Sequence, residues 1–396
     1  MRWETVQISE FCKTGTGGTP SRGNMERYYE GGTIPWVKSG ELRENIITGT
    51  GEHVTETALR ETSIKLVPAG ALLLALYGAT VGRLGILGVE ATTNQAVCHI
   101  IPDPKKANVR YLFHALSDQV SNLVARGVGG AQPNISQGIV KELGLMLPPL
   151  AEQKRIAAIL DAADALRTKR REALAQLDAL LQSSFLTLFG DPVTNPMGWE
   201  TSPLSGVAHS IVDGPFGSNL KTSDYVAAGV PVLQGKNITG DSFKWFDIRF
   251  ITPTKARTLA RSDARVDDHL LIKIGSIGYS AIIHDLKGHE FAIIPANMCR
   301  IRRDPRKVEA LFLHAFLTNE RTANTLRGLA SKTAQPALSL GKIRALTLPL
   351  PPLPLQQKFA AIVESVERQK TTQRAHLAEL DALFAALQHR AFRGEL

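Results

Sequence analysis

Apolar residues follow a seven-residue rhythm over two long stretches of the chain, one near the middle and one at the C-terminus. Such a rhythm predicts a long helix whose apolar stripe is covered by a second helix. About 35 residues at 1.5 Å each make a rod of roughly 50 Å. Gly190-Asp191-Pro192 ends the first stretch. We expect the two helices to pair through Ile156, Ile159, Leu166, Leu177, Leu180, Phe359, Ile362, Val366, Leu380 and Leu383.

The residues before each long helix have a different pattern. Short β-like runs occur at residues 71–76, 85–89 and 293–301, among many glycines. A helical stretch follows at residues 111–124 and at residues 311–326. A proline cluster, at residues 147–149 and 349–352, then separates this part from the long helix. The pattern predicts a mixed α+β domain in front of each helix.

The two halves of the chain are copies of one unit. Trp3-Glu4-Thr5 recurs as Trp199-Glu200-Thr201, and the helical run LDAL at residues 177–180 recurs at residues 380–383. Matches occur in one order at an offset of about 200 residues, which drifts by only about seven. Each copy is long enough to be a domain with its own core.

The predicted fold is therefore α+β, a tandem duplicate of a mixed α/β domain plus a long helix, with the two helices forming an antiparallel coiled coil. The expected boundaries are 1–148 for the first domain, 149–190 for its helix, 191–350 for the second domain and 351–396 for its helix.

Polar residues in the helical stretches leave two alternatives open. Arg170 and Gln373 occupy equivalent central positions, and they either meet in a buried polar layer that fixes the register or extend to water. Basic residues cluster around them, and these either face DNA phosphates or form a solvated face. The cluster consists of Arg167, Lys169, Arg171, Arg368, Lys370 and Arg374.

Composition bears on the class of partner and on the cellular compartment of the protein. The formal net charge of the 396 residues is +9, which suits a polyanion such as nucleic acid but also occurs in proteins that do not bind one. The three cysteines are far apart, which excludes a C-x-x-C metal knuckle and indicates reduced thiols. The sequence has no signal-peptide pattern and no apolar run that could span a bilayer. We expect a soluble, cytoplasmic protein.

Sequence signatures of catalysis are missing. The chain has no G-x-G-x-x-G, no G-x-x-x-x-G-K-[ST] and no H-E-x-x-H, and it lacks the Asn/Asp-Pro-Pro-aromatic signature of adenine methyltransferases. Asp268 with Asp285 and Lys287 imitates a metal-dependent nuclease only loosely, and in one copy only. We therefore expect no catalytic residue and no metal site in this chain.

Several motifs resemble those of the specificity subunits of Type I restriction-modification systems. Residues 147–156 (LPPLAEQKRI) look like the entry to that family's conserved helices, and residues 351–359 (PPLPLQQKF) are a similar echo without the glutamate. Residues 130–136 (GAQPNIS) resemble the motif that closes a target recognition domain. Residues 77–82 (YGATVG) resemble an inner loop of that domain with one residue inserted, and the ending at residues 391–395 (AFRGE) also fits. The resemblance covers the whole chain.

The resemblance implies a non-catalytic, DNA-reading scaffold. Such a subunit reads an asymmetric two-part target in double-stranded DNA and binds two methyltransferase subunits, and it leaves open whether two restriction subunits join. S-adenosylmethionine belongs to the methyltransferase partners, ATP and Mg²⁺ belong to restriction partners, and this chain is expected to bind no cofactor. Two readers about one duplex turn apart, roughly 34 Å, would read two short blocks separated by a spacer.

Polar loop residues are the candidates for DNA contact, because base edges require paired donors and acceptors and phosphates require cations. The alternative for each is an ordinary solvated side chain. The candidates of the first copy are Lys13, Arg22, Lys38, Ser39 and Arg83. Those of the second copy are Ser218, Asn219, Lys221, Gln234, Lys236, Asn237, Lys273 and Tyr279, followed by the basic run Arg300, Arg302 and Arg303.

Two other function classes remain open at the level of the sequence. One is a self-contained DNA nuclease or methyltransferase with an unrecognised site. The other is a two-headed adaptor for protein partners. Turnover by the isolated chain would indicate the first, and a lack of sequence-dependent DNA retention would indicate the second.

Overall fold

The computed structural model describes residues 3–127, 133–215 and 219–396, and the chain divides into two units. Unit 1 consists of Met1–Glu172 together with Ala375–Leu396, and unit 2 is Ala173–Arg374. Each unit therefore contains one half of each long helix, α6 (Leu150–Phe189) and α11 (Leu353–Ala391). The last residues of the chain belong to the same unit as the first.

Unit 1 is built on a five-stranded sheet in the order β2-β9-β6-β7-β4, antiparallel except for the parallel pair β4 and β7. A smaller sheet, β5-β3-β8, contains a parallel pair, β3 and β8. The strands are β1 (Thr5–Gln7), β2 (Cys12–Thr16), β3 (Ile34–Val37), β4 (Asn45–Ile47), β5 (His53–Val54), β6 (Leu72–Ala75), β7 (Leu84–Leu87), β8 (Thr92–Thr93), β9 (Val97–Pro102) and β10 (Gly144–Met146). The helices besides α6 are α1 (Ile8–Phe11), α2 (Met25–Tyr28), α3 (Glu56–Glu61), α4 (Val109–Arg126) and α5 (Gln137–Lys141).

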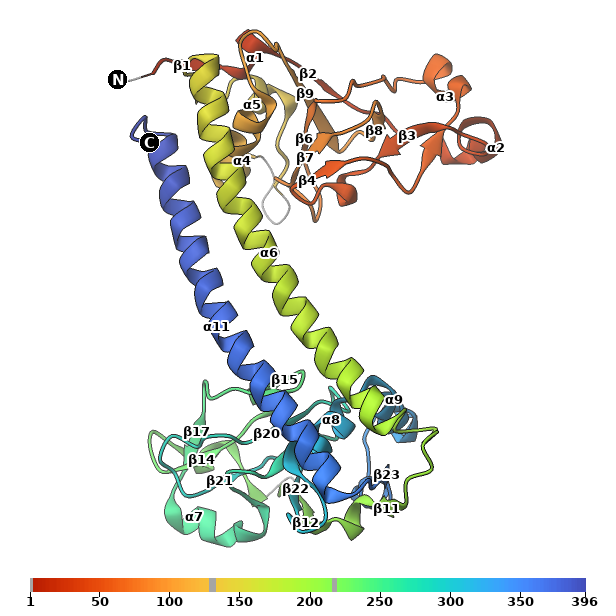
Figure 1. Ribbon diagram of the computed structural model, residues 1–396, viewed down its shortest axis with the longest axis vertical. Helices are drawn as coiled ribbons and strands as arrows, with labels where there is room; N and C mark the ends of the chain where they lie inside the picture. The colour runs from red at the N-terminus through yellow and green to blue at the C-terminus, as the bar shows by residue number, and fades with distance from the viewer. Residues whose placement is uncertain (1–2, 128–132, 216–218) are drawn as a thin grey trace. The chain divides into compact units, whose positions relative to one another are not determined.

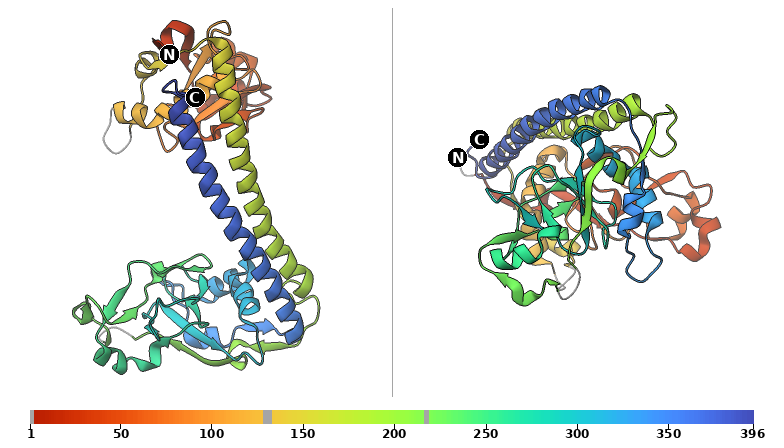
Figure 2. Two further views of the ribbon diagram at one scale, coloured as in Figure 1. Left: turned by 60° about the vertical axis from the view of Figure 1, so that its left-hand side comes forward. Right: turned by 90° about the horizontal axis from the view of Figure 1, so that it is seen from below.

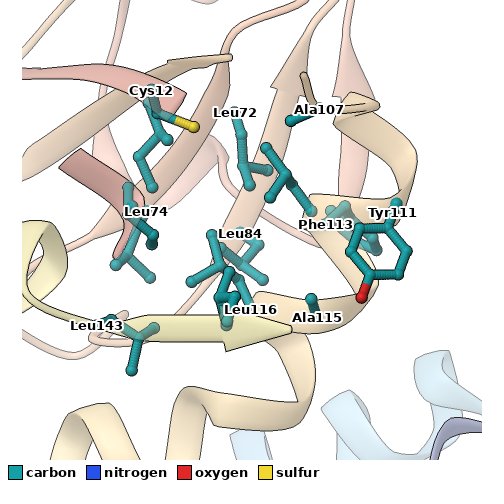
Figure 3. Packing of buried hydrophobic residues seen from close by; sticks show 14 of the residues in the cluster. Cys12, Leu72, Leu74, Leu84, Ala107, Tyr111, Phe113, Ala115, Leu116 and Leu143 are labelled. Atoms are coloured by element: carbon teal, nitrogen blue, oxygen red, sulfur yellow. The ribbon is translucent and has the colours of Figure 1, made fainter. Parts of the chain in front are cut away.

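The main core of unit 1 lies between the sheet and α4. Leu84 of β7 lies next to Leu116 of α4, and Leu74 of β6 belongs to the same cluster (Figure 3). Ile156 and Leu160 from the first turns of α6 belong to the same core, as does Ala391 at the end of α11. Burying such side chains is the main driving force for forming the unit.

Unit 2 repeats this plan with differences. Its main sheet has the order β12-β22-β19-β20, and a second sheet has the order β13-β17-β14-β21-β18. The strands are β11 (Thr201–Pro203), β12 (Ala208–Asp213), β13 (Tyr225–Val226), β14 (Val230–Val232), β15 (Ile238–Thr239), β16 (Ser242–Phe243), β17 (Arg249–Ile251), β18 (Asp263–Ala264), β19 (His269–Ile272), β20 (Ser280–Ile282), β21 (Ala292–Ile293), β22 (Met298–Arg303) and β23 (Thr347–Pro349). The helices besides α11 are α7 (Pro253–Thr258), α8 (Ala310–Thr318), α9 (Glu320–Leu329) and α10 (Leu340–Arg344).

Two element predictions need correction in unit 2. The helix expected over residues 311–326 is two helices, because the Asn319 side chain accepts a hydrogen bond from the backbone of Arg321 and caps α9. The β-like run at residues 293–301 is divided between β21 and β22. Pro295 lies between these strands and has no backbone N–H for a sheet ladder.

The long helices pair in an antiparallel manner within each unit (Figures 1 and 2). In unit 1, Arg155 of α6 donates to the Leu396 backbone and Arg167 donates to Asp381, so higher numbers on one helix face lower numbers on the other. In unit 2, Phe185 and Phe189 of α6 pack on Phe359 of α11. The predicted mixed fold with a long helix pair is confirmed.

The predicted pairing residues differ in burial. Ile156, Phe359 and Val366 are buried, and four others are half-buried: Ile159, Leu177, Ile362 and Leu380. The expectation of burial is wrong for Leu166, Leu180 and Leu383, which are 52%, 47% and 49% exposed. Within each unit, the other long helix therefore covers fewer apolar positions than the seven-residue pattern contains. Arg170 and Gln373 belong to different units, so their meeting stays a prediction.

A fully buried histidine, His269, makes unit 2 sensitive to acid. His269 donates from Nε2 to the Ala310 carbonyl (2.9 Å), and its ring centre lies 6.3 Å from that of His314. Burial, with His314 as the next cause, lowers the pKa of His269 to about 3. The unfolded chain takes up this proton near pH 6.5, whereas the folded unit does not.

The free energy of unfolding of unit 2 should therefore fall as the pH drops below about 6.5, and the part due to His269 levels off near pH 3. His269→Gln should reduce the slope by up to about 1.4 kcal/mol per pH unit. Urea titrations between pH 7 and pH 5 measure this slope, with hydrogen exchange of unit 2 peptides as the readout of unfolding. The exposed His376→Gln serves as control, and equal slopes for the two variants would contradict the prediction.

Candidate nucleic-acid interface

The loop after β3 in unit 1 gathers polar side chains on a rigid turn. Lys38 follows the strand directly, and its backbone N–H donates to Glu41 Oε2 (2.8 Å). The other oxygen of Glu41 accepts from Thr50 Oγ1 (2.7 Å) and from the backbone of Gly51 (2.9 Å). The Lys38 ammonium forms an ion pair with Glu52, the residue just before β5. The loop therefore holds the Lys38 ammonium within a network of hydrogen bonds and an ion pair.

Arg22 joins this network from an earlier segment. Its Nη2 donates to Glu52 Oε2 (2.6 Å), and its guanidinium carbon lies 4.4 Å from the ring centre of Tyr29 and 5.2 Å from that of Trp36. Both rings are buried and anchored, since Tyr29 donates to the Pro20 carbonyl and Trp36 to the Gly18 carbonyl. Both rings therefore lie within cation–π range of the Arg22 guanidinium.

Unit 2 has a corresponding loop after β14. The backbone N–H of Gln234 donates to Asn237 Oδ1 (2.8 Å), as that of Lys38 does to Glu41. Lys236 forms an ion pair with Asp247, which lies just before β17. The Gln234 amide donates to the Asp247 carbonyl (2.9 Å). In each unit, a lysine bound to a carboxylate thus lies on the loop after the strand that has a parallel partner, β3 in unit 1 and β14 in unit 2.

These carboxyl groups stay ionised to low pH. Hydrogen bonds from Lys38 and then Arg22 lower the pKa of Glu52, and the hydrogen bond from Lys236 lowers that of Asp247. Burial alone would raise the pKa of Glu41, but the hydrogen bonds from the Lys38 backbone and Thr50 outweigh it and the pKa is lowered. The ion pairs of both loops therefore persist throughout the neutral range.

Comparison with known proteins agrees with this duplicated arrangement. The family model described as "Type I restriction modification DNA specificity domain" matches residues 1–176 and again residues 196–382. The chain belongs to this family. Both copies found in the sequence are thus matches to one domain type.

Relatives in the family extend over different shares of the chain. The specificity subunit of the Type I restriction enzyme EcoR124I/EcoR124II from Escherichia coli is 27% identical over 47% of this chain and 46% of that subunit. The MjaIX specificity subunit from Methanocaldococcus jannaschii is 25% identical, and the match covers all of this chain and 93% of that subunit.

Two solved structures share the fold of this family member. A chain solved in work on complex assembly and conformational transition of the type I R-M system has a TM-score of 0.62 at 20% identity, covering 100% of this chain and 98% of that one. The Type-I restriction-modification S subunit from M. genitalium has a TM-score of 0.57 at 15% identity, covering 99% and 96%. At such identities the likeness establishes the fold alone.

The predicted DNA contacts of this specificity-family chain fall into distinct groups. Lys13, Asn219, Lys221 and Tyr279 are exposed, whereas Ser39 and Gln234 are half-buried. Arg22, Lys38, Arg83 and Lys236 are at the surface but ion-paired, Arg83 with Glu44 at 2.7 Å. Ser218 lies outside the described residues. The surface residues stay candidates for DNA contact.

For three residues, burial contradicts the prediction of a DNA contact. Asn237 is fully buried and donates to the Lys244 and Phe246 carbonyls. Lys273 is buried beside Asp213, with which its ammonium forms an ion pair at 3.2 Å. Arg300 is only 3% exposed, and burial lowers its pKa. None of the three side chains can reach DNA in this conformation.

The basic run of β22 is not a basic surface. Arg300 and Arg302 alternate with Cys299 and Ile301, which face the core, as in any strand. Arg302 donates to both oxygens of the buried Asp268, at 2.9 and 2.7 Å, and Arg303 donates to the Val308 carbonyl (3.2 Å). Carboxylates from neighbouring segments neutralise much of this run. This basic run is therefore not a patch of unpaired positive charge.

At least four of the six helix cations form ion pairs with carboxylates of the long helices. In unit 1, Arg167 contacts Asp164 and Asp381 and lies over the Phe384 ring at 4.3 Å. In unit 2, Lys370 is buried and contacts Asp178 and Glu367. The ion pairs of Arg167 and Lys370 occupy equivalent positions in the two copies, and each of them joins the two long helices. Arg171 and Arg374 are exposed but also ion-paired, Arg171 with Asp381 (3.1 Å) and Arg374 with Glu367 (3.8 Å).

Sequence reasoning missed the residues that organise both loops. Glu41, Glu52 and Asp247 carry the hydrogen bonds and ion pairs that hold the lysines, and no spacing or motif marks them. Gly78, Gly82, Gly275 and Gly278 all have positive φ, a conformation that glycine adopts without strain.

The described part of the chain offers no group of three or more His, Cys, Asp or Glu side chains placed to hold a metal ion. Among the helices that the structure describes, none is both long and apolar enough to cross a membrane.

Proposed function

We propose that this chain is the DNA-sequence-specificity subunit of a Type I restriction-modification complex. Unit 1 reads one short block of an asymmetric target, and unit 2 reads another. The observation that carries this proposal is the double match to a DNA specificity domain, one match in each half of the chain. The loops after β3 and β14, here called the recognition loops, differ in their polar residues: Lys38, joined by Arg22, in unit 1, and Gln234 and Lys236 in unit 2. The two blocks should therefore differ in sequence.

The proposed partners are double-stranded DNA and two methyltransferase subunits, with two restriction subunits where the system also cleaves. S-adenosylmethionine is bound by the methyltransferase, and ATP with Mg²⁺ by the restriction subunits. The chain itself is proposed to be non-catalytic, because its sequence lacks the nucleotide-binding and methyltransferase signatures. A complex that modifies host DNA works in the cytoplasm.

Genome-wide mapping of methylated adenine in a host that carries this chain with its methyltransferase tests the proposal. We expect one bipartite motif, which disappears when the chain is deleted. Exchanging residues 191–350 for the second domain of a relative should change one block and leave the other. The exchange keeps both helices, so the spacer between the blocks should stay the same.

The purified chain alone provides the control. It should neither cut nor methylate DNA when Mg²⁺ or S-adenosylmethionine is supplied. Turnover by the lone chain would show a self-contained enzyme, and a complex that methylates without sequence preference would show that the chain is an adaptor.

A further inference from the structure

The ion pairs of the two recognition loops occupy the same place in the topology. In unit 1, β3 carries the Lys38 loop, and its antiparallel partner β5 is directly preceded by Glu52. In unit 2, β14 carries the Lys236 loop, and its antiparallel partner β17 comes just after Asp247. Lys38 and Lys236 are not at equivalent sequence positions, yet each is bound by a carboxylate from the same side. The two units thus share this arrangement of lysine and carboxylate, although their loop sequences differ.

The carboxylate in unit 1 holds two cations at once. Glu52 Oε1 binds Lys38 and Glu52 Oε2 binds Arg22, so the three groups together carry one net positive charge. Arg22 also contacts the rings of Tyr29 and Trp36. Its side chain is still 47% exposed, which leaves part of its fork of N–H donors facing outward.

This arrangement suits base reading better than phosphate binding. A carboxylate beside two cations weakens their attraction to phosphate, because it cancels one charge. It also removes the freedom of both side chains, and a preordered arginine fork loses less entropy when it binds a base edge. Stability is a weak reason for the arrangement, since exposed ion pairs contribute little to it. The main effect of the carboxylate is therefore to orient the two cations.

We propose that Glu52 in unit 1 and Asp247 in unit 2 are positioning residues, each of which sets base discrimination in one block of the target without touching DNA. Glu52 does so through Arg22 and Lys38, and Asp247 does so through Lys236. This inference rests on the proposed function, because it presupposes that each unit reads one block.

The test measures methylation by the complex on a DNA library randomised in both blocks. Glu52→Gln should lower the preference for the correct base about tenfold at one or more positions of one block. Affinity for DNA without the target should not fall, because the variant gains local positive charge. Asp247→Asn should relax the other block. Glu61→Gln is the matched control, since Glu61 forms an exposed ion pair with Arg27 in the same unit.

Arg22→Lys adds a variant that keeps the charge but loses the planar fork. It should relax the same block as Glu52→Gln. The inference is overturned if Glu52→Gln scales binding to all sequences equally, if it behaves like Glu61→Gln, or if Arg22→Lys leaves that block unchanged. A wild-type complex without any bipartite motif would instead refute the proposed function itself.

Discussion

Replacing Phe189 with alanine should lower the free energy of unfolding of unit 2 by about 3–5 kcal/mol. Phe189 is 2% exposed and packs edge-on against Phe185, Phe312 and Phe359, with ring centres 5.1, 4.7 and 5.4 Å away. These rings come from α6, α8 and α11, so the truncation opens a cavity where three helices meet. Close-packed surroundings relax only partly into such a cavity. Urea denaturation followed by hydrogen exchange of unit 2 peptides measures the loss.

Two further variants make this prediction specific. Leu186→Ala, three residues earlier on the same helix, removes a side chain that is 47% exposed and should change stability by less than about 0.5 kcal/mol. Phe392 packs on Tyr111 in unit 1, with ring centres 5.7 Å apart, much as Phe189 packs on Phe312 in unit 2. Phe392→Ala should therefore destabilise unit 1. A loss from Phe189→Ala that appears first in unit 1 would contradict the division of the cores.

The second large effect is expected for the buried glutamines at the start of the long helices. Gln153 is fully buried, accepts from the backbone N–H of Asn108 (2.8 Å) and donates to the Lys106 and Pro148 carbonyls (2.8 Å each). Leucine has a similar size but no polar atoms, so Gln153→Leu leaves three backbone groups unpaired. At about 1–3 kcal/mol for each, the free energy of unfolding of unit 1 should fall by at least about 3 kcal/mol.

The duplicate copy supplies a graded comparison. Gln356 accepts from the Glu309 backbone (2.9 Å) and donates to the Pro351 carbonyl (2.8 Å), which is one fewer hydrogen bond. Gln356→Leu should therefore destabilise unit 2 less than Gln153→Leu destabilises unit 1. Gln357→Leu, the same change at the next and exposed position, should have little effect. Equal losses at Gln356 and Gln357 would show that the buried hydrogen bonds contribute nothing.

Helix positions could be predicted well from the chain because local signals set them. The heptad pattern and Gly190 predicted that α6 ends near residue 189, and Gly190 has the positive φ of a residue after a helix end. The break at Asn319 was missed, because an asparagine inside an apolar helical pattern is as compatible with a polar surface position as with a cap. The alternation of β22 was visible, but the carboxylates that neutralise its arginines lie more than thirty residues away.

The sequence by itself determined the duplication, the mixed domain with its long helix, and the resemblance that led to a DNA-reading function, since repeats, periodicity and motifs are properties of the linear chain. Only the tertiary structure decided which cations are free to meet DNA. Charge is visible in the sequence, but burial and pairing depend on residues brought together by folding, as Glu52 is with Arg22 and Lys38. The same reason explains why Arg300 and Lys273 were mistaken for surface groups and why Glu52 and Asp247 went unnoticed.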